Sequence, residues 1–507
     1  MKVVWSAVIA LGIAGAAYAD DDEAKTTPRT YTQAEVEALL DLATRVTKLE
    51  EMQQDAELEK LRKAAEKEKQ DDQASLPGRV SKLEKQLAEN KPTWDASKML
   101  YFATPDGNFT AKIGGRLYVV YRHIMDWSSN GATPNNNATS GGPSAADSFI
   151  IDSARFQLDG TFFKDFYYRI EGEAKSGETV NGVLSTGFFR TKDVYMGWQG
   201  LGDWFQLQAG QFKMTLSQEE TTSSRFIDFA ERSILNRLVP GHIQGIRASG
   251  GLFDRTFEWY LGITNGSSVR DGDRGSLDTN DEKDYFGRFF VTPFKTMDVG
   301  FVKSLRLGFD FSYGKRDNPS TAPGSISSGD LGLPQILTVA PVGGTVFEGR
   351  QIREDFNFSW NYGSMNIRAE YLWIKNELEA ATPLAAAHHQ EAWYISTAYV
   401  LTGEEKTLEN RIKPFNNFSP LDGQWGAWEI AARWAVVNQD NDTGIAGSAN
   451  QTHTTEYTLG INWWMTPNVR LMIDWERLTY DRDIVTGFNG ALKRSEDEIY
   501  VRWQIDF

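Results

Sequence analysis

The 507-residue sequence contains no cysteine, which excludes disulfides, thiolate metal sites and thiol nucleophiles. It also lacks a long apolar run after residue 20, whereas a transmembrane helix needs about 20 consecutive apolar residues. If the chain crosses a membrane, it must therefore form a closed β-barrel, because only helices and closed sheets satisfy their backbone polar groups in lipid. Acidic residues outnumber basic ones, 69 to 53. The formal net charge of −16 argues against a nucleic-acid-binding protein.

Common signatures of hydrolytic active sites are missing too. The sequence has neither the Gly-x-Ser-x-Gly turn of serine hydrolases nor the His-Glu-x-x-His motif of zinc peptidases. We therefore expect no enzymatic activity, no metal site and no cofactor.

Aromatic residues, in contrast, are abundant, with 16 Trp, 18 Tyr and 29 Phe. Over residues 499–507 apolar side chains occupy the odd positions and tyrosine or polar side chains the even ones. Successive side chains of a strand point to opposite faces, so this segment would be a strand with one apolar and one polar face. It fits the wall of an outer-membrane barrel, whose last residue is typically Phe. A large soluble β-protein is the alternative, since its strands alternate as well.

Sixteen candidate strands follow one another from Thr110 to Phe507. Their connections mostly alternate between short and long, as the turns and external loops of outer-membrane barrels do. Two connections, 293–303 and 402–423, are too long for turns, so either they pack back against the barrel or the strand count is off there. The expected fold is all-β: a 16-stranded antiparallel transmembrane β-barrel with an N-terminal α-helical coiled-coil extension. The aromatics expected at the membrane interfaces are Trp463, Trp475, Tyr480 and Trp503.

The residues before the barrel divide into two segments. Residues 1–19 have the charged start, apolar stretch and Ala-Tyr-Ala ending of a secretory signal peptide, although a short membrane anchor is an alternative. Residues 32–91 are rich in Ala, Glu, Lys and Leu, and their three-four apolar spacing predicts a coiled coil, with a single solvated helix as the alternative. The expected domains are a signal peptide at 1–19, a periplasmic coiled-coil segment at 20–93 and the barrel at 94–507.

Two stretches carry a family resemblance. The first lies within 210–233 and begins Gly-Gln-Phe-Lys; the second lies within 401–434 and ends Trp-Gly-Ala-Trp-Glu-Ile-Ala-Ala-Arg-Trp. They resemble segments of the phosphate-selective porins of the O and P type. The resemblance implies a sixteen-stranded trimeric outer-membrane porin whose third external loop folds into the lumen. It also implies that Phe507 is the assembly signal read by the barrel-assembly machinery.

Arginines recur on the expected polar faces of the strands. A guanidinium group is planar and always charged, so a column of such groups can pass an anion from one site to the next. The lumen-wall candidates are Arg116, Arg155, Arg169, Arg306, Arg368, Arg433, Arg470 and Arg502. Carboxylates such as Glu171, Glu429 and Asp474 share these faces. Ion pairs between neighbouring strands would then neutralise many of the arginines.

The long connection from 213 to 241 is the best candidate for a constriction. Its charged candidates are Lys213, Glu219, Glu220, Arg225, Arg232 and Arg237. With Asp228 and Glu231 added, four basic residues stand against four acidic ones, so the signs in this connection are balanced, with no obvious cluster of basic residues. A porin is therefore implied, and a phosphate preference is left open.

Together these features predict an outer-membrane porin, a water-filled channel for passive diffusion of small hydrophilic solutes, with an anion or phosphate preference to be tested. Two alternatives stand beside it: a barrel-anchored structural protein that tethers the outer membrane to peptidoglycan through its coiled coil, and a sugar porin lined by Tyr118, Trp464 and Tyr500. The expected partners are outer-membrane lipids, further copies in a homotrimer, small anions or other hydrophilic solutes and the barrel-assembly machinery, without nucleic acid. The expected location is the bacterial outer membrane, with the N-terminal segment in the periplasm.

Overall fold

The computed structural model divides the chain into two compact units, Met1–Ala88 and Glu89–Phe507. It describes residues 41, 44, 48, 58–61, 93–95, 99–104, 106–125, 148–174, 178–180, 183–185, 189–266, 281–316, 326–327, 335–337, 349–377, 387–440, 453–485 and 492–507. The described residues of the first unit are helical. The signal peptide and most of the coiled coil lie outside the described residues and stay predictions. No helix among the described residues is both long and apolar enough to span a membrane.

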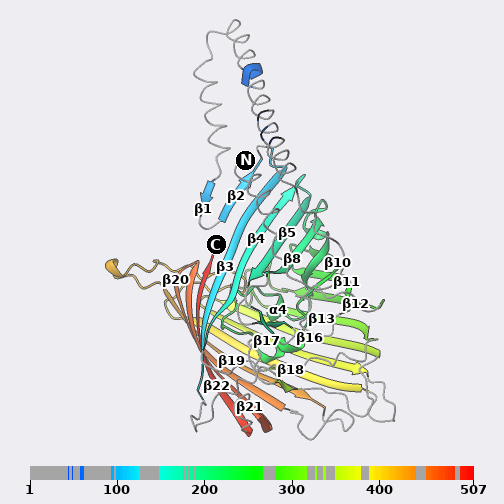
Figure 1. Ribbon diagram of the computed structural model, residues 1–507, viewed down its shortest axis with the longest axis vertical. Coiled ribbons are helices and arrows are strands. Elements are labelled where there is room, and N and C mark those ends of the chain that lie inside the picture. The colour runs from blue at the N-terminus through cyan, green and yellow to red at the C-terminus, as the bar shows by residue number, and fades with distance from the viewer. Residues whose placement is uncertain are drawn as a thin grey trace. The chain divides into compact units, whose positions relative to one another are not determined.

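The second unit is a closed barrel of sixteen antiparallel strands (Figure 1). The strands are β3 (Phe109–Ile124), β4 (Ser148–Phe162), β5 (Phe166–Ala174), β8 (Phe189–Trp198), β9 (Gln206–Lys213), β10 (His242–Leu252), β11 (Phe257–Asn265), β12 (Lys283–Val291), β13 (Arg306–Arg316), β16 (Gly349–Tyr362), β17 (Met365–Glu377), β18 (Ala387–Val400), β19 (Ala427–Gln439), β20 (His453–Thr466), β21 (Val469–Val485) and β22 (Leu492–Asp506). Each pairs with the next, and β22 pairs with β3, which closes the barrel. The predicted strand count and fold class are confirmed.

Two short strands extend the barrel sheet at its seam. β1 (Thr93–Asp95) pairs with β2 (Met99–Ala103), and β2 pairs with the beginning of β3. The C-terminal strand β22 pairs with the same edge of β3 from Arg116 onward. The remaining strands form two separate two-stranded sheets, β6 (Glu178–Val180) with β7 (Val183–Ser185) and β14 (Ile326–Ser327) with β15 (Gln335–Leu337).

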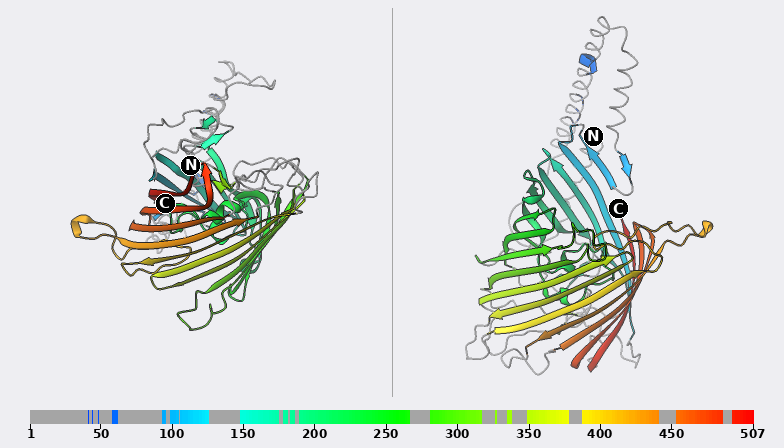
Figure 2. Two further views of the ribbon diagram at one scale, coloured as in Figure 1. Left: turned by 90° about the horizontal axis from the view of Figure 1, so that it is seen from below. Right: turned by 180° about the vertical axis from the view of Figure 1, so that it is seen from behind.

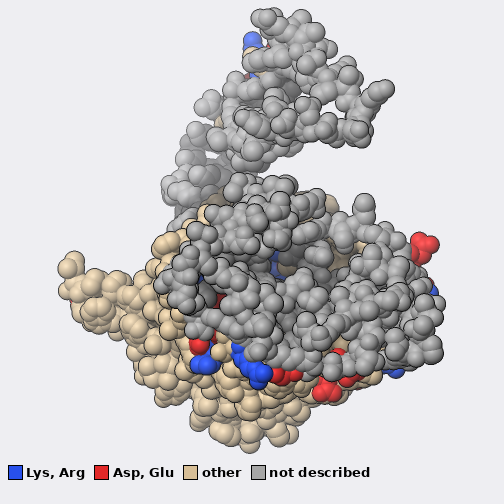
Figure 3. Space-filling model, turned by 60° about the horizontal axis from the view of Figure 1, so that its bottom comes forward, with Lys and Arg blue, Asp and Glu red and all other residues tan. Residues whose placement is uncertain are grey.

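The polar faces of the strands point into the barrel. In β22 the side chains of Arg502 and Gln504 are 1% exposed, whereas Trp503 and Ile505 are 43% and 47% exposed. Apolar side chains thus cover the outside, and the outer wall visible in Figure 3 is mostly uncharged. A barrel with water inside and lipid outside requires this arrangement.

One predicted interfacial aromatic lies on the other face. Trp463, Trp475 and Trp503 are on the outer face, but Tyr480 is buried inside the barrel, where its hydroxyl donates to Glu496 at 3.0 Å. The prediction for Tyr480 was wrong because its even position already places it on the polar face of β21, with Asp474.

Both long connections pack back against the barrel. The connection after β18, which includes the 3-10 helix η5 (Pro420–Asp422), buries Ile412 in a cluster with Val400, Ala427 and Trp464. The connection between β12 and β13 is held by Trp360, whose indole N–H donates to the carbonyl of Phe301 at 2.7 Å. The strand count is therefore correct, and the first of the two predicted explanations holds.

Candidate functional site in the barrel lumen

Residues 214–241, the connection between β9 and β10, fold into the barrel, and we call them the inner loop. The loop contains α4 (Gln218–Thr221) and the 3-10 helix η3 (Ile234–Leu238), and Figures 1 and 2 show it within the ring of strands. Ser217 caps α4, because its Oγ accepts a hydrogen bond from the backbone N–H of Glu220 at 3.2 Å. This inward fold agrees with the resemblance described above.

Apolar side chains dock the inner loop on strands β17 to β21. The docked cluster includes Leu216, Ile234, Leu235, Leu238 and Val239 of the loop and Leu372, Ile374, Tyr394, Val437 and Leu478 of the wall. Burying one large apolar side chain stabilises the docked state by roughly 1.5–3 kcal/mol. The hydrophobic effect therefore holds the loop against one side of the lumen.

Wall carboxylates accept hydrogen bonds from the backbone of the inner loop. Glu370 of β17 accepts from two N–H groups in the first turn of α4, at 3.0 and 2.6 Å. Asp474 of β21 accepts from Ala230 at 2.5 Å. Glu456 of β20 accepts from Ile234 at 2.7 Å. These carboxylates satisfy buried N–H groups that have no partner within the loop.

Three of the predicted lumen-wall arginines donate to backbone carbonyls of the inner loop. The distances are 2.9 Å for Arg433, 2.9 Å for Arg470 and 2.5 Å for Arg502. Arg433 also pairs with Glu456 at 2.5 Å. These guanidinium groups fasten the loop, and the loop covers them.

Three further predicted arginines also have close partners. Arg368 donates to a carbonyl of the long connection after β18 at 2.6 Å. Arg306 pairs with Glu258 at 3.5 Å, and Arg169 pairs with Asp159 at 2.5 Å. Neighbouring carboxylates thus neutralise Arg306 and Arg169, as the alternative interpretation of the inward faces expected.

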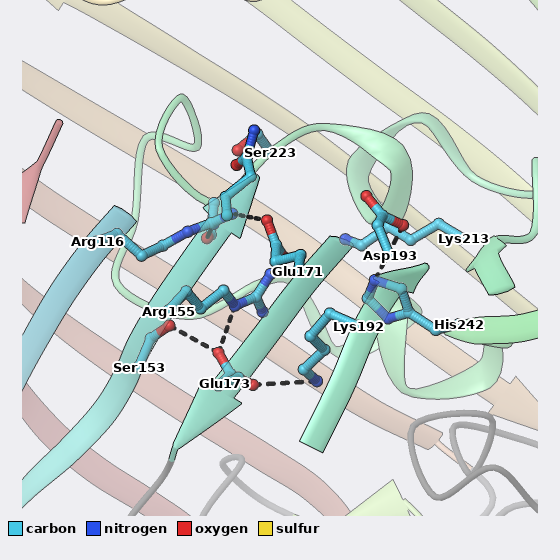
Figure 4. Close-up of polar contacts among 12 residues, drawn as sticks. Arg116, Ser153, Arg155, Glu171, Glu173, Lys192, Asp193, Lys213, Ser223 and His242 are labelled. Carbon is cyan, nitrogen blue, oxygen red and sulfur yellow. Dashed lines mark hydrogen bonds and ion pairs between the residues drawn. The ribbon is translucent and has the colours of Figure 1, made fainter. Parts of the chain in front are cut away.

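The remaining two wall arginines belong to a charged network on β3, β4, β5 and β8 (Figure 4). Arg155 pairs with Glu171 at 2.6 Å and with Glu173 at 2.5 Å. Arg116 pairs with Glu171 at 3.2 Å, and Lys192 pairs with Glu173 at 3.1 Å. Among the described residues, three cations thus contact two carboxylates in this network.

A second cluster joins the end of β9 to the inner loop. Lys213 Nζ lies 2.9 Å from Glu220, and Arg232 Nε lies 3.8 Å from the same carboxylate. Burial alone would raise the pKa of Glu220, but the charges of Lys213 and Arg232 lower it to about 2. The carboxylate is therefore ionised at neutral pH, and two cations share it.

The side chains of the other three constriction candidates have different partners. Glu219 accepts a hydrogen bond from the Ser233 hydroxyl at 2.5 Å, and Arg237 lies 3.9 Å from Glu231. Arg225 donates to the carbonyl of residue 115 at 3.2 Å. Burial and the nearby charge of Arg116 lower the pKa of Arg225 to about 10. The six predicted residues thus serve different contacts and do not form one ring.

The sequence analysis did not single out Lys406. It enters the barrel from the connection after β18 and is 3% exposed, with Nζ 2.5 Å from Asp228 of the inner loop and 2.6 Å from Glu429 of β19. Burial opposes ionisation of Asp228, but the charges of Lys406 and Arg368 hold its pKa well below the usual range. The signal in the sequence was the excess length of this connection, which does not reveal where its lysine binds.

A closed sixteen-stranded barrel with an apolar outside, a polar inside and an inward-folded loop defines an outer-membrane porin. The chain belongs to the family of phosphate-selective porins O and P, whose family model matches residues 134–486. It is therefore a channel-forming protein of the outer membrane.

Porin O of Pseudomonas aeruginosa is 26% identical over 415 residues, which cover 77% of this chain and 87% of that protein. Among solved structures, the outer membrane channel DcaP of Acinetobacter baumannii covers 80% of this chain at 10% identity, with 99% of its own chain matched and a TM-score of 0.46. Salmonella typhi OmpF in complex with daunomycin covers 80% of this chain at 8% identity, with 99% of its own chain matched and a TM-score of 0.48.

Proposed function

We propose that this porin passes small anions along the side of the lumen formed by β4, β5, β8 and β9. The apolar cluster of the inner loop docks on β17 to β21, and the loop covers Arg433, Arg470 and Arg502. The observation that carries the proposal is the difference in side-chain exposure: Arg155 and Lys213 are 15% and 20% exposed, whereas Arg433 and Arg502 are each at most 4% exposed. A passing ion therefore meets Arg155 and Lys213 more readily than Arg433 and Arg502.

The ion pairs on the open side favour negative ions. Glu171 is 3% exposed beneath Arg155, and Glu220 is 11% exposed beside the more accessible Lys213. Water and solute reach the cation of each pair more readily than its carboxylate. The local potential along this path is therefore more positive than the net charge of the chain implies.

Phosphate is one anion that this path would serve. Guanidinium and ammonium N–H groups bind phosphate oxygens through charge-assisted hydrogen bonds, and Arg155 of β4 and Lys192 of β8 offer both groups on the two strands that flank β5. The family description, phosphate-selective porin O and P, supports this choice of solute.

Single thiols test where the path runs, because the chain has no cysteine of its own. We expect a negatively charged thiosulfonate reagent to modify Arg155→Cys and to lower its conductance in planar bilayers. Arg502→Cys should react much more slowly, because the inner loop covers that position. Arg350→Cys, on the exposed rim, should react without a change in conductance and serves as the control. Fast modification of Arg502→Cys together with an unreactive Arg155→Cys would place the path on the other side.

We also propose the assembled form that the sequence predicts: a homotrimer surrounded by outer-membrane lipids, with residues 20–93 in the periplasm. Phe507 is the proposed signal for the barrel-assembly machinery. Its backbone exchanges hydrogen bonds with Gly115 at 2.9 and 3.0 Å, and its ring is half exposed, so the final residue is accessible at the barrel edge. The sugar-porin alternative gains no support, because Tyr118, Trp464 and Tyr500 are at most 2% exposed and cannot line an open track.

A further inference from the structure

A cavity of about 590 Å³ lies in the barrel near the short turns of β4, β5, β9 and β10. None of its lining residues belongs to the inner loop. They come from β2 to β5, from β8 to β11 and from the turns between these strands. Short turns face the periplasm in outer-membrane barrels, so this chamber would lie at the periplasmic end of the path. Its volume is within the range of small-molecule sites.

The chamber combines tyrosine rings with an excess of cations. Its aromatic lining consists of Tyr101, Tyr167, Tyr168, Tyr195 and Tyr260. Four cationic side chains and two carboxylates complete its charged lining: Lys112, Arg169, Arg247, Arg255, Asp159 and Asp203. Such a lining favours a ligand that is both negatively charged and flat.

Arg247 is the residue in this chamber best placed to bind a ligand. Its Nη2 donates to Gln208 at 2.8 Å, and its guanidinium carbon lies 4.8 Å from the ring centre of Phe212 and 5.5 Å from that of Tyr260. No carboxylate of the described residues pairs with Arg247, and its buried Nε has no hydrogen-bond partner among them. Arg247 is half-buried in the lining of the cavity, and a guanidinium without a carboxylate partner is costly there unless a ligand engages it.

Two further tyrosines, Tyr167 and Tyr195, line the same chamber. Tyr167 and Tyr195 meet edge to face with their ring centres 6.2 Å apart, and the guanidinium of Arg169 lies 5.8 Å from the ring centre of Tyr195. Arg169 is already paired with Asp159. Among the described residues, the chamber therefore offers a guanidinium group without a carboxylate partner next to several aromatic faces.

We propose that this chamber is a transient binding site for aromatic carboxylates, which deepens the proposed anion path and rests on it. The carboxylate accepts two parallel hydrogen bonds from Arg247, and the ring packs on the tyrosines in offset or edge-to-face geometry. Inorganic phosphate would use the guanidinium but gain nothing from the rings. A neutral sugar would leave the guanidinium unpaired.

Benzoate is the probe, with acetate as the matched carboxylate that lacks the ring. In planar bilayers we expect benzoate to reduce the chloride current of the full-length protein at a concentration at least tenfold below that of acetate. The Arg247→Gln variant should lose this effect, and Arg247→Lys should retain only part of it, because lysine keeps the charge without the planar fork. In Tyr260→Leu, the concentrations at which benzoate and acetate reduce the current should become more similar. The proposal would be overturned if benzoate and acetate reduced the wild-type chloride current at equal concentrations. An unchanged reduction of the current by benzoate in Arg247→Gln would overturn it as well.

A measurement without current separates this inference from the anion path. Saturation-transfer NMR of benzoate with the detergent-solubilised protein should show binding to the wild type and to Arg350→Gln, and at least tenfold weaker binding to Arg247→Gln. Heat-modifiable migration on gels checks that each variant is folded. If the pore prefers cations but still binds benzoate, the proposed anion path is rejected and the proposed binding site in the chamber is retained. Anion preference with no benzoate binding would reject the chamber alone.

Discussion

Gly115 shows how a single residue determines the closure of the barrel. Its backbone pairs with Phe507, and the ring of Phe507 lies across it. A Cβ at Gly115 would stand 2.7 Å from the carbonyl oxygen of Arg155 and 2.8 Å from the Phe507 ring. No side chain other than hydrogen fits there unless the seam shifts.

We expect Gly115→Val to destabilise the seam by about 1–3 kcal/mol, because overpacking forces backbone movement. The yield of heat-modifiable, folded barrel should fall accordingly. Gly300→Val is the matched control, since a Cβ at Gly300 meets nothing within 4 Å. Equal yields from the two variants would show that the contact of Phe507 with Gly115 is dispensable.

Replacing Lys406 should destabilise the protein more than Gly115→Val does, because Lys406 neutralises two buried carboxylates. Replacing it in Lys406→Met leaves Asp228 and Glu429 without their cation, and breaking a buried pair costs about 3–5 kcal/mol. We expect a lower melting temperature in detergent and a noisier current, since the inner loop loses an anchor. Lys315→Met is the control: its pair with Glu282 is 49% and 40% exposed, so its loss should cost about 1 kcal/mol or less. Similar melting temperatures for the two variants would contradict the role of Lys406.

The inner loop is the element that decides which charges remain accessible. Its apolar cluster and its bonds to Arg433, Arg470 and Arg502 hold it on one side of the lumen. Two of its carboxylates, Glu220 and Asp228, have lowered pKa values because cations face them. A group with a lowered pKa stabilises the docked loop above its ordinary pKa of about 4, and this contribution declines as the pH falls towards the lowered value.

The contribution of Glu220 and Asp228 to docking of the loop should therefore be complete at neutral pH and be lost only in strong acid. We expect single-channel current to be quiet from pH 7 down to about 4.5 and to show loop fluctuations as the pH falls towards 2. In Lys406→Met the onset should move to higher pH, because Asp228 loses the charge that lowers its pKa. Fluctuations that grow above pH 7 and vanish in acid would have the wrong sign for this mechanism.

Strand faces could be predicted from the sequence, whereas side-chain partners could not. Period two correctly placed Arg433 and Arg502 inside the barrel, because a strand alternates whatever it pairs with. The same pattern cannot show that these arginines bind loop carbonyls, since those partners lie 202 and 272 residues away in the chain. Lys406 was missed for the same reason. Irregular connections have no periodicity from which a side-chain direction follows.

At the scale of the whole molecule, the two units are expected to have separable roles. The barrel contains every lumen contact described above, and the coil predicted within residues 32–91 belongs largely to the other unit. We expect deletion of 32–91 to leave single-channel conductance unchanged. Altered envelope integrity in cells that carry the deletion would support tethering through the coil, and unchanged integrity would count against it. A loss of conductance would contradict the assignment of the pore to the barrel alone.

The net charge of −16 describes the molecule as a whole and does not describe the path. Ion selectivity follows the local potential, which on the open side is set by Arg155, Lys192 and Lys213 above more deeply buried carboxylates. The decisive measurement is the reversal potential of the purified protein in a planar bilayer under a potassium chloride gradient. We expect a potential of the sign that indicates chloride preference, and a reduced preference in Arg155→Gln but not in Arg350→Gln. A reversal potential that indicates potassium preference in the wild type would contradict the proposed anion path.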